Sequence, residues 1–532
     1  MRLIKRFGFL LLIALMDQLY AQASERPKIV VGIVVDQMRF DYLQRFKAHF
    51  TEGGFKRLMN EGVNFTSMHY NYKPTMTAAG HASIFTGATP SMHGVVGNGW
   101  YSRKEKSEVY CVKFPTEDGV GIYSPQRMKT NTLADEIKLS LGDRSKSFGI
   151  SLKDRGAILP AGHMADGAYW FEGEQGGFVS SEYYAQAEVD WVEAFNAQNF
   201  YKNYLADGWK LLRPQEIYHT LDDHRDYERP FLKGERTAFP YALKSAHKVK
   251  GDDLIKSTPF GNQLLADFAK EVILNNSLGE DGQLDFFSIS FSSTDYIGHQ
   301  FGVQSTEIMD TYLRLDETLA DLLSFFDEQF EGEYVVFLTA DHGASENRNH
   351  LIKKGIPAGY LDRRTIEKQL ETHLDEVFGE ADWILSSNNL NIYLNSALFA
   401  SAEKQIERDD VIGAAYYFLK DQEGVLDVYV PEFGQADQFL MEASARGFYP
   451  KESGDLVLIE QTNWNAYPET GSGHSSLYAY DTHVPFMIMG KGIAGRQEDQ
   501  PYVITDIVPS LAKFLGTSLP DGVRDYQTME LK

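Results

Sequence analysis

The sequence predicts an α/β fold, with a doubly wound, mostly parallel sheet and a cap inserted late in the chain. Three short apolar runs, Lys28–Val35, Phe286–Phe291 and Tyr334–Thr339, have the continuous hydrophobicity of strands that are buried on both faces. Leucines and phenylalanines at helical spacing over Leu313–Phe326 separate the second run from the third. Strands that alternate with helices are typical of a doubly wound sheet.

Each apolar run leads to an acidic residue. The first run continues into Asp36, the second is followed by Asp295 and the third by Asp341. Any one of these acids alone is more simply explained as the cap of a following helix. Because the carboxyl ends of parallel strands meet at one edge of a sheet, the three acids together predict a site at that edge.

Histidines accompany these acids at spacings that suit metal binding. His299 follows Asp295 by four residues, which puts both side chains on one face of a helical turn. His342 directly follows the acid of the third run, and adjacent ligands on a sharp turn can bind one metal or two. His474, in the small-residue loop G-S-G-H-S-S, is a further candidate ligand. His483 directly precedes an apolar run and is predicted to be structural.

Composition limits the classes of function. The chain has 532 residues, with 51 Lys and Arg against 75 Asp and Glu, and a net charge of −24. Binding to nucleic acid or to an anionic membrane surface is therefore not expected. Cys111 is the single cysteine, which excludes an intrachain disulfide and a cysteine-based metal cluster. Any metal must be bound by histidine and carboxylate.

The N-terminus has the pattern of a signal peptide. Basic residues precede the apolar run Gly8–Met16, and the small residues Ala21 and Ala23 follow it. We therefore expect residues 1–23 to be removed near Ala23, and the mature protein to be periplasmic or secreted without a membrane anchor. The rest of the chain is expected to form an α/β core over residues 24–382, a cap over 383–465 and a return to the core over 466–532. A peripheral excursion from the core is expected at about 173–250.

Two further segments and one turn carry residues that can take part in catalysis. Thr77 begins a predicted helix within P-T-M-T-A-A-G-H, and it is either the N-cap or a nucleophile. Lys153 and Arg155 lie on one side of the extended segment S-L-K-D-R-G, and they either face solvent or reach the sheet edge. Asn98, in V-G-N-G-W, is either a turn residue or an amide donor.

Taken together, these motifs resemble the alkaline phosphatase superfamily, and more narrowly the phosphate-irrepressible, threonine-nucleophile (PafA-like) alkaline phosphatases. The matching segments are V-V-D-Q-M-R, P-T-x-T-A-x-G-H, the G-N-G that precedes Trp100, S-L-K-D-R-G, S-S-T-D-x-x-G-H, A-D-H-G and the loop that holds His474. They run from Asp36 to His474 in the family's order. The later segment Thr505–Leu511 is similar to the final helix of the superfamily.

The resemblance implies a zinc-dependent phosphatase that hydrolyses small-molecule phosphate monoesters through a phosphothreonine intermediate at Thr77. It implies two zinc ions per chain and no structural magnesium, because Lys153 takes the place of that third metal. Lys153, Arg155 and Asn98 would bind the phosphate oxygens, and a monomer is expected. The implied metal ligands are Asp36, Thr77, Asp341 and His342 for one zinc, and Asp295, His299 and His474 for the other.

Two other functions stay open at the level of sequence. Phosphodiesterases and nucleotide pyrophosphatases of the same superfamily have a similar set of metal ligands, but they are not expected to carry S-L-K-D-R-G. A phosphate monoester has an extra anionic oxygen that favours two cationic partners, so the monoesterase is preferred. A noncatalytic phosphate- or metal-binding module would not need Thr77 together with Lys153 and Arg155.

Overall fold

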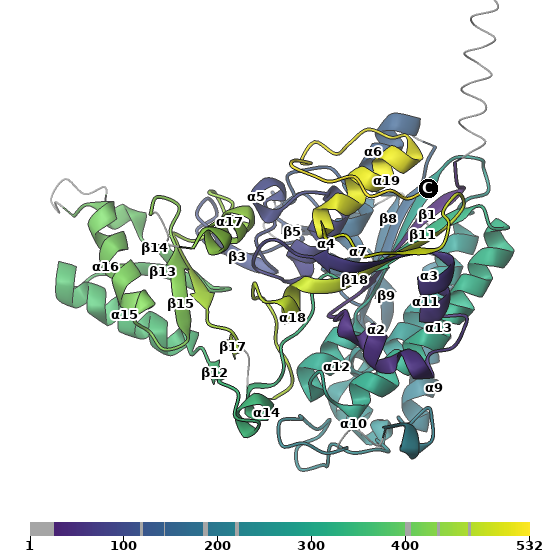
Figure 1. Cartoon of the computed structure of the whole chain (residues 1–532), viewed down its shortest axis with the longest axis horizontal. Helices are drawn as coiled ribbons and strands as arrows, with labels where there is room; N and C mark the ends of the chain where they lie inside the picture. The colour runs from purple at the N-terminus through teal and green to yellow at the C-terminus, as the bar shows by residue number, and fades with distance from the viewer. Residues whose placement is uncertain are drawn as a thin grey trace, which may run out of the picture.

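A computed structural model describes residues 26–117, 121–142, 144–184, 190–218, 223–399, 406–433, 437–466 and 470–532. The signal peptide expected over residues 1–23 lies outside the described residues. Figure 1 shows a large body built around one sheet and a smaller body beside it, which is formed by the green part of the chain. We call the larger body the core and the smaller body the cap.

The core contains a ten-stranded, mostly parallel sheet, which confirms the predicted fold class. The three apolar runs form β1 (Ile29–Val35), β10 (Asp285–Phe291) and β11 (Tyr334–Thr339), and β1 pairs in parallel with both of the others. β7 (Ser147–Ser151) pairs in parallel with the other side of β10. The remaining strands are β2 (Val63–His69), β8 (Gly167–Glu172), β9 (Gly177–Val179), β18 (His483–Gly490), β19 (Arg496–Glu498) and β20 (Tyr502–Val503). The order is β19-β2-β18-β11-β1-β10-β7-β8-β9, and β20 pairs with β2.

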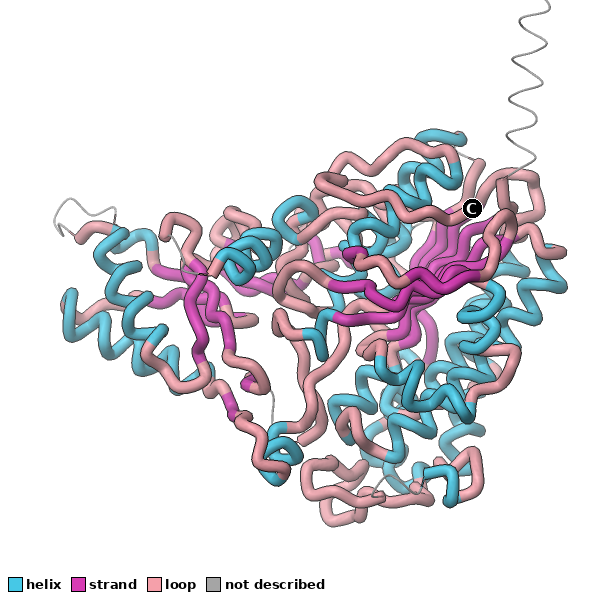
Figure 2. Tube along the Cα trace, in the orientation of Figure 1, coloured by secondary structure: helices cyan, strands magenta, loops and turns pink. Residues whose placement is uncertain are grey.

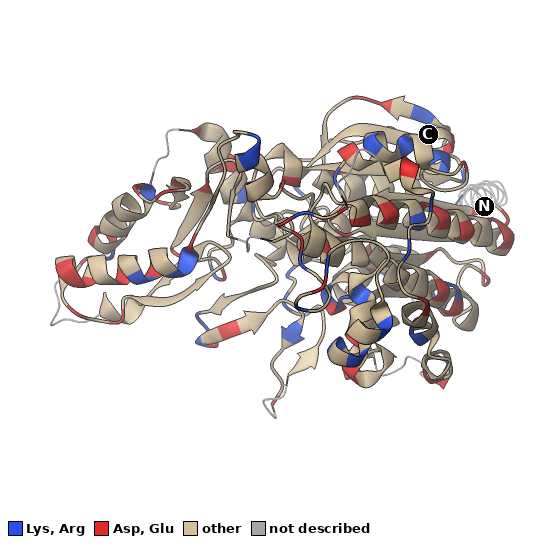
Figure 3. Cartoon of the chain, turned by 90° about the horizontal axis from the view of Figure 1, so that it is seen from below, with Lys and Arg blue, Asp and Glu red and all other residues tan. Residues whose placement is uncertain are grey.

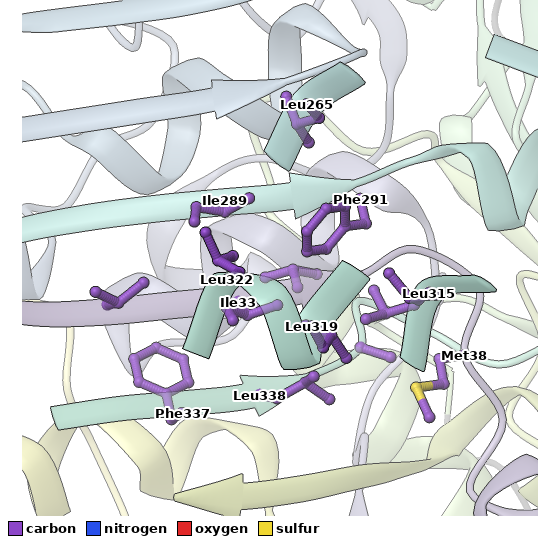
Figure 4. Packing of buried hydrophobic residues seen from close by; sticks show 14 of the residues in the cluster. Ile33, Met38, Leu265, Ile289, Phe291, Leu315, Leu319, Leu322, Phe337 and Leu338 are labelled. Atoms are coloured by element: carbon purple, nitrogen blue, oxygen red, sulfur yellow. The ribbon is translucent and has the colours of Figure 1, made fainter. Parts of the chain in front are cut away.

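Helices pack on both faces of this sheet, whose strands form the large magenta band in Figure 2. The core helices include α4 (Thr77–Thr86), α6 (Leu133–Leu141), α7 (Asp154–Ala161), α11 (Phe260–Asn275), α12 (Ser293–Phe301), α13 (Thr306–Phe330) and α19 (Ile507–Leu515). On one face, Leu319 of α13 lies against Ile33 and Leu338 (Figure 4). On the other face, Phe85 of α4 contacts Phe337 with ring centroids 5.9 Å apart. The helix expected from the leucine and phenylalanine spacing lies within α13, so that prediction is confirmed.

The cap has its own antiparallel sheet, of order β13-β14-β16-β15, and its own hydrophobic cluster. Its elements are β13 (Ile384–Asn388), β14 (Asn391–Leu394), β15 (Val425–Tyr429), β16 (Leu456–Glu460), α15 (Arg363–Phe378), α16 (Arg408–Lys420) and α17 (Gln438–Gly447). Ile366, Leu370 and Leu374 of α15 belong to the same buried cluster as Trp383. The cap of the structure therefore begins before residue 383, the boundary expected from the sequence, because the apolar face of α15 packs within the cap.

The excursion expected at about 173–250 packs closely onto the core. Its helices are α8 (Asp190–Ala197), α9 (Phe200–Asp207) and α10 (Leu243–Lys250). Phe195, Leu205 and Trp209 are buried in the same hydrophobic cluster as the strands of the main sheet. Within the part of the chain that the structure describes, no helix combines the length and the apolar character that crossing a membrane requires.

Candidate active site and metal centre

Four neighbouring strands bring the candidate residues to one edge of the main sheet. β11 is followed by Asp341 and His342, and its neighbour β1 is followed by Asp36. Next in the sheet, β10 is followed by Asp295 on α12, and β7 is followed by Lys153. Because all four strands run in parallel, these ends lie side by side although the residues are far apart in the sequence. The structure thus brings together the residues that the sequence predicts for one site.

A first cluster consists of Asp36, Asp341 and His342, each fully buried, with one potential ligand atom from each within 4.8 Å of the others. His342 Nε2 lies 3.7 Å from Asp36 Oδ1 and 3.5 Å from Asp341 Oδ2. None of these three atoms forms a hydrogen bond. Since buried polar atoms are normally satisfied, three such atoms around one point fit a bound cation.

A second cluster consists of Asp295, His342 and His474, again with ligand atoms within 4.8 Å of one another. His474 Nε2 lies 3.9 Å from Asp295 Oδ1, and its ring stacks on that of His342 with centroids 3.6 Å apart. His299, one helical turn after Asp295 on α12, has its Nε2 3.1 Å from the same Asp295 oxygen. His299 therefore lies beside this second cluster, and His342 is shared by both.

The histidine rings are oriented by the backbone. Each Nδ1 lies within hydrogen-bonding distance of a carbonyl oxygen: His299 with Ser472 at 2.7 Å, His342 with Gly343 at 2.9 Å, and His474 with Thr75 at 2.8 Å. When Nδ1 donates to a carbonyl, the Nε2 lone pair is left to bind a metal. Burial lowers the pKa of His474 well below its usual value, which favours the neutral ring that a metal requires.

Lys153 links the two clusters. Its ammonium group donates to Asp36 Oδ2 and to Asp295 Oδ2, both at 2.6 Å, and its side chain is 2% exposed. Burial, reinforced by Asp341, raises the pKa of Asp36 well above its usual value. Burial also opposes ionisation of Asp295, but His299 and Lys153 outweigh it and hold the pKa of this carboxyl well below its usual value. One oxygen of each carboxylate thus contacts Lys153, and the other lies beside the histidines of an Asp/His cluster.

Thr77 is the first residue of α4 and is 1% exposed. Met76 occupies the N-cap position, so Thr77 is not the cap, which was one of the two roles that the sequence allowed. The next backbone N–H of the helix donates to Asn98 Oδ1 at 2.9 Å, so the Asn98 amide NH₂ is the group left to contact an anion. α4 passes close to the first cluster at Gly80. A Cβ atom at this position would lie only 2.3 Å from the Asp341 carbonyl oxygen, so only glycine fits.

Arg155 lies in the first turn of α7. Its Nη1 donates to Tyr110 Oη at 3.0 Å, and that hydroxyl donates to Asp154 Oδ1 at 2.5 Å. Burial lowers the pKa of Arg155, but Tyr110 and Asp154 outweigh this effect and keep it well above its usual value. The Nε atom is buried without a hydrogen-bond partner, so the guanidinium group retains a donor for an anionic ligand.

Two residues of the site were not predicted. The Gln37 side chain donates to Asp295 Oδ1 at 2.6 Å, and its backbone N–H donates to Asp341 Oδ1 at 3.1 Å. Its place in the segment V-V-D-Q-M-R is the one signal that could have identified it. No local pattern marks Tyr110, which ends the hairpin strand β4 (Ser107–Tyr110). His483 instead lies 2.9 Å from a carbonyl oxygen of β2, as expected for a structural residue.

Two Asp/His clusters, a threonine at a helix N-terminus and a Lys/Arg pair at one sheet edge define the class as metal-dependent phosphoryl-transfer enzymes. The chain belongs to the type I phosphodiesterase/nucleotide pyrophosphatase family, whose sequence pattern matches residues 30–483. It is thus a hydrolase of the alkaline phosphatase superfamily, as its motifs predict.

Individual relatives match nearly the whole chain. It is 40% identical to a protein named calcium-transporting ATPase from Myroides odoratus, over 95% of this chain and 94% of that one. It is 37% identical to alkaline phosphatase PafA from Elizabethkingia meningoseptica, over 97% of this chain and 96% of that one. Two solved structures of alkaline phosphatase PafA each match with a TM-score of 0.89 at 36% identity. One is the wild type, and the other is a variant in which a threonine, an asparagine, a lysine and an arginine are replaced. They cover 94% of this chain and 98% of their own.

Proposed function

We propose that this chain is an exported, zinc-dependent alkaline phosphatase that hydrolyses phosphate monoesters through a phosphothreonine intermediate at Thr77. The observation that carries the proposal is the pair of buried Asp/His clusters, which Lys153 joins through Asp36 and Asp295. Thr77 begins α4, and Asn98 accepts a hydrogen bond from the next backbone N–H of that helix. The PafA variant with four replaced residues supports it, because those residue types occur here in the same order as the four candidates. Export rests on the signal-peptide pattern over residues 1–23.

The residues present fit two zinc ions. One would be held by Asp36, Thr77, Asp341 and His342, and the other by Asp295, His299 and His474. The donor set has no thiolate and consists of imidazole, carboxylate and hydroxyl groups, which suit Zn²⁺. Three of these donor atoms are buried without hydrogen bonds, which gives a cation its partners. When bound, the metals lower the pKa of the Thr77 hydroxyl and stabilise the oxygen of the leaving group.

The chain's own residues account for the remaining parts of the reaction. Thr77 Oγ1 bonds to phosphorus as the bond to the ester oxygen breaks, and the released alcohol takes up a proton. Lys153, Arg155 and the Asn98 amide bind the nonbridging oxygens and hold the phosphoryl group in line. Water then attacks phosphorus as the bond between phosphorus and Thr77 Oγ1 breaks. A proton from the water restores the Thr77 hydroxyl, and inorganic phosphate leaves. Lys153 occupies the space between Asp36 and Asp295, which supports the expectation that no structural magnesium is bound.

The diesterase of the family's name is the main alternative. In a phosphate diester, one of the oxygens that is anionic in the monoester carries a carbon substituent and no charge, so a second cation near the phosphoryl group loses its partner. Lys153 is buried between the two Asp/His clusters, and Arg155 keeps an unpartnered Nε. This pair of cations supports the monoesterase. A noncatalytic binding module would give Thr77 no chemical role.

The experiment compares Thr77→Ala with Thr77→Ser in zinc-loaded mature protein. The alanine variant should lose roughly 10³-fold or more of kcat toward an aryl phosphate monoester, because no hydroxyl remains to attack phosphorus. Metal analysis should still find two zinc ions per chain. The serine variant keeps the hydroxyl and should turn over substrate. Full activity in the alanine variant would refute the nucleophile.

A further inference from the structure

A buried ion pair joins the cap to the core beside the candidate site. Lys73 Nζ donates to Glu460 Oε2 at 2.5 Å and to the Leu458 carbonyl oxygen at 2.7 Å. The two side chains are 2% and 4% exposed. Glu460 ends β16 of the cap, and Lys73 lies in the core loop between β2 and α4. Burying two charges has a desolvation cost, which offsets much of their attraction. Such a pair therefore adds little to the free energy of unfolding, and its main effect is to fix how the two segments are placed against each other.

The loop that contains Lys73 also carries parts of the proposed site. The Thr75 carbonyl oxygen is the hydrogen-bond partner of His474 Nδ1 at 2.8 Å, and the Thr75 hydroxyl donates to the Ser476 carbonyl oxygen at 3.0 Å. Thr77 follows two residues later as the first residue of α4. The anchor to the cap, the contact that orients His474 and the proposed nucleophile therefore all lie within residues 73–77.

The cap contacts this region at further points. The end of α17 lies so close to the loop that a Cβ on Gly447 would be 1.5 Å from the Lys73 carbonyl oxygen. Tyr478 Oη donates to the Glu460 carbonyl oxygen at 2.9 Å, which ties the same cap residue to the segment that follows His474. In Figure 1, α17 lies on the side of the cap that faces the core. Lys73 is the one charged residue among residues 70–76, so no neighbouring charge can replace it as an anchor.

We propose that Lys73 and Glu460 are positioning residues, through which the cap fixes the loop that presents Thr77 and orients His474. This inference rests on the proposed function, since it gives the pair a role in threonine attack and in the second metal site. Lys153 is the N-cap residue of α7 and Arg155 lies in its first turn, so both lie outside this loop. Loss of the pair should therefore impair alignment for attack and leave phosphate binding largely intact.

The test is the double variant Lys73→Met/Glu460→Leu, which removes both charges with little change in volume. Apolar replacement of a buried ion pair is often neutral for folding. With an alkyl phosphate monoester, whose poor leaving group makes the chemical step limiting, kcat should fall about 10- to 100-fold. KM should stay within about threefold of the wild-type value, and the thermal unfolding midpoint should be unchanged. Backbone amides of residues 75–79 should exchange hydrogen faster, with and without metal.

Glu108→Ala is the matched control. Glu108 also joins core to cap, through the Ser386 hydroxyl and the Asn388 amide, but it lies outside the nucleophile loop and is exposed. Its kcat should change by less than about twofold. Wild-type kcat or unchanged hydrogen exchange in the double variant, or an equal loss in the control, would overturn the positioning role. A wild-type protein without monoesterase activity would instead contradict the proposed function, and the exchange comparison would still decide the inference.

Discussion

Arg155→Ala should selectively weaken the hydrolysis of phosphate monoesters. The arginine donates to Tyr110 at 3.0 Å, and its Nε is buried without a partner. In the proposed function this group donates to a phosphate oxygen. The substitution leaves the hydrogen bond between Tyr110 and Asp154 in place, so the Tyr110 hydroxyl is not left without a hydrogen-bond partner. A hydrogen bond to a charged group contributes about 1.5–3 kcal/mol, which corresponds to about 10- to 150-fold in kcat/KM for a monoester.

The assay compares an aryl monoester with its bis-aryl diester in the wild type, in Arg155→Ala and in Arg57→Ala. A diester lacks the third anionic oxygen, so its kcat/KM should change by no more than about threefold. Arg57 is a suitable control, because its side chain is 17% exposed against 19% for Arg155 and it pairs with Asp327 away from the site. Equal losses for the two substrates, or equal losses in the two variants, would refute the role given to Arg155.

Two further predictions concern charge. Acidic residues occur on both core and cap (Figure 3), and the net charge is −24. Added salt screens this charge and should therefore raise kcat/KM for an anionic substrate. A steep fall in kcat/KM at modest salt would contradict this. Burial raises the pKa of Glu228 to about 7, so between about pH 4.5 and pH 7 the folded state binds a proton that the unfolded state releases. The wild-type free energy of unfolding therefore falls as pH rises through this window, and Glu228→Gln should gain on the order of 3 kcal/mol relative to wild type between about pH 5 and pH 8. A difference between the two unfolding free energies that does not vary with pH would refute this.

The acidic residues at the strand ends were predictable, because the pattern that identifies them lies within a few neighbouring residues. A continuous apolar run followed by an acid identifies a buried strand and the polar residue at its carboxyl end, as with Asp36 after β1. The order of the strands carries no such signal. β1 pairs with β10 and β11, which lie far along the chain, and only the parallel ladders bring Asp36, Asp295 and Asp341 together.

The features that could not be predicted from the sequence depend on packing between residues that are far apart in the chain. The start of the cap was expected at residue 383, because an amphipathic helix such as α15 does not reveal which body its apolar face will contact. Tyr110 and Glu460 are ordinary residues in their local sequence. Each acquires a role only where the fold brings it to Arg155 or to Lys73.

The most direct test of a metal-dependent monoesterase is kcat/KM for an aryl phosphate monoester and its bis-aryl diester, measured on zinc-loaded mature protein before and after chelation. We expect a large preference for the monoester, which is lost when the metals are removed and restored with zinc, because in the proposed function Lys153 and Arg155 act together with both Asp/His clusters. A preference for the diester would be compatible with the fold and with the two Asp/His clusters. It would contradict the phosphate-binding role of the Lys/Arg pair and favour the phosphodiesterase.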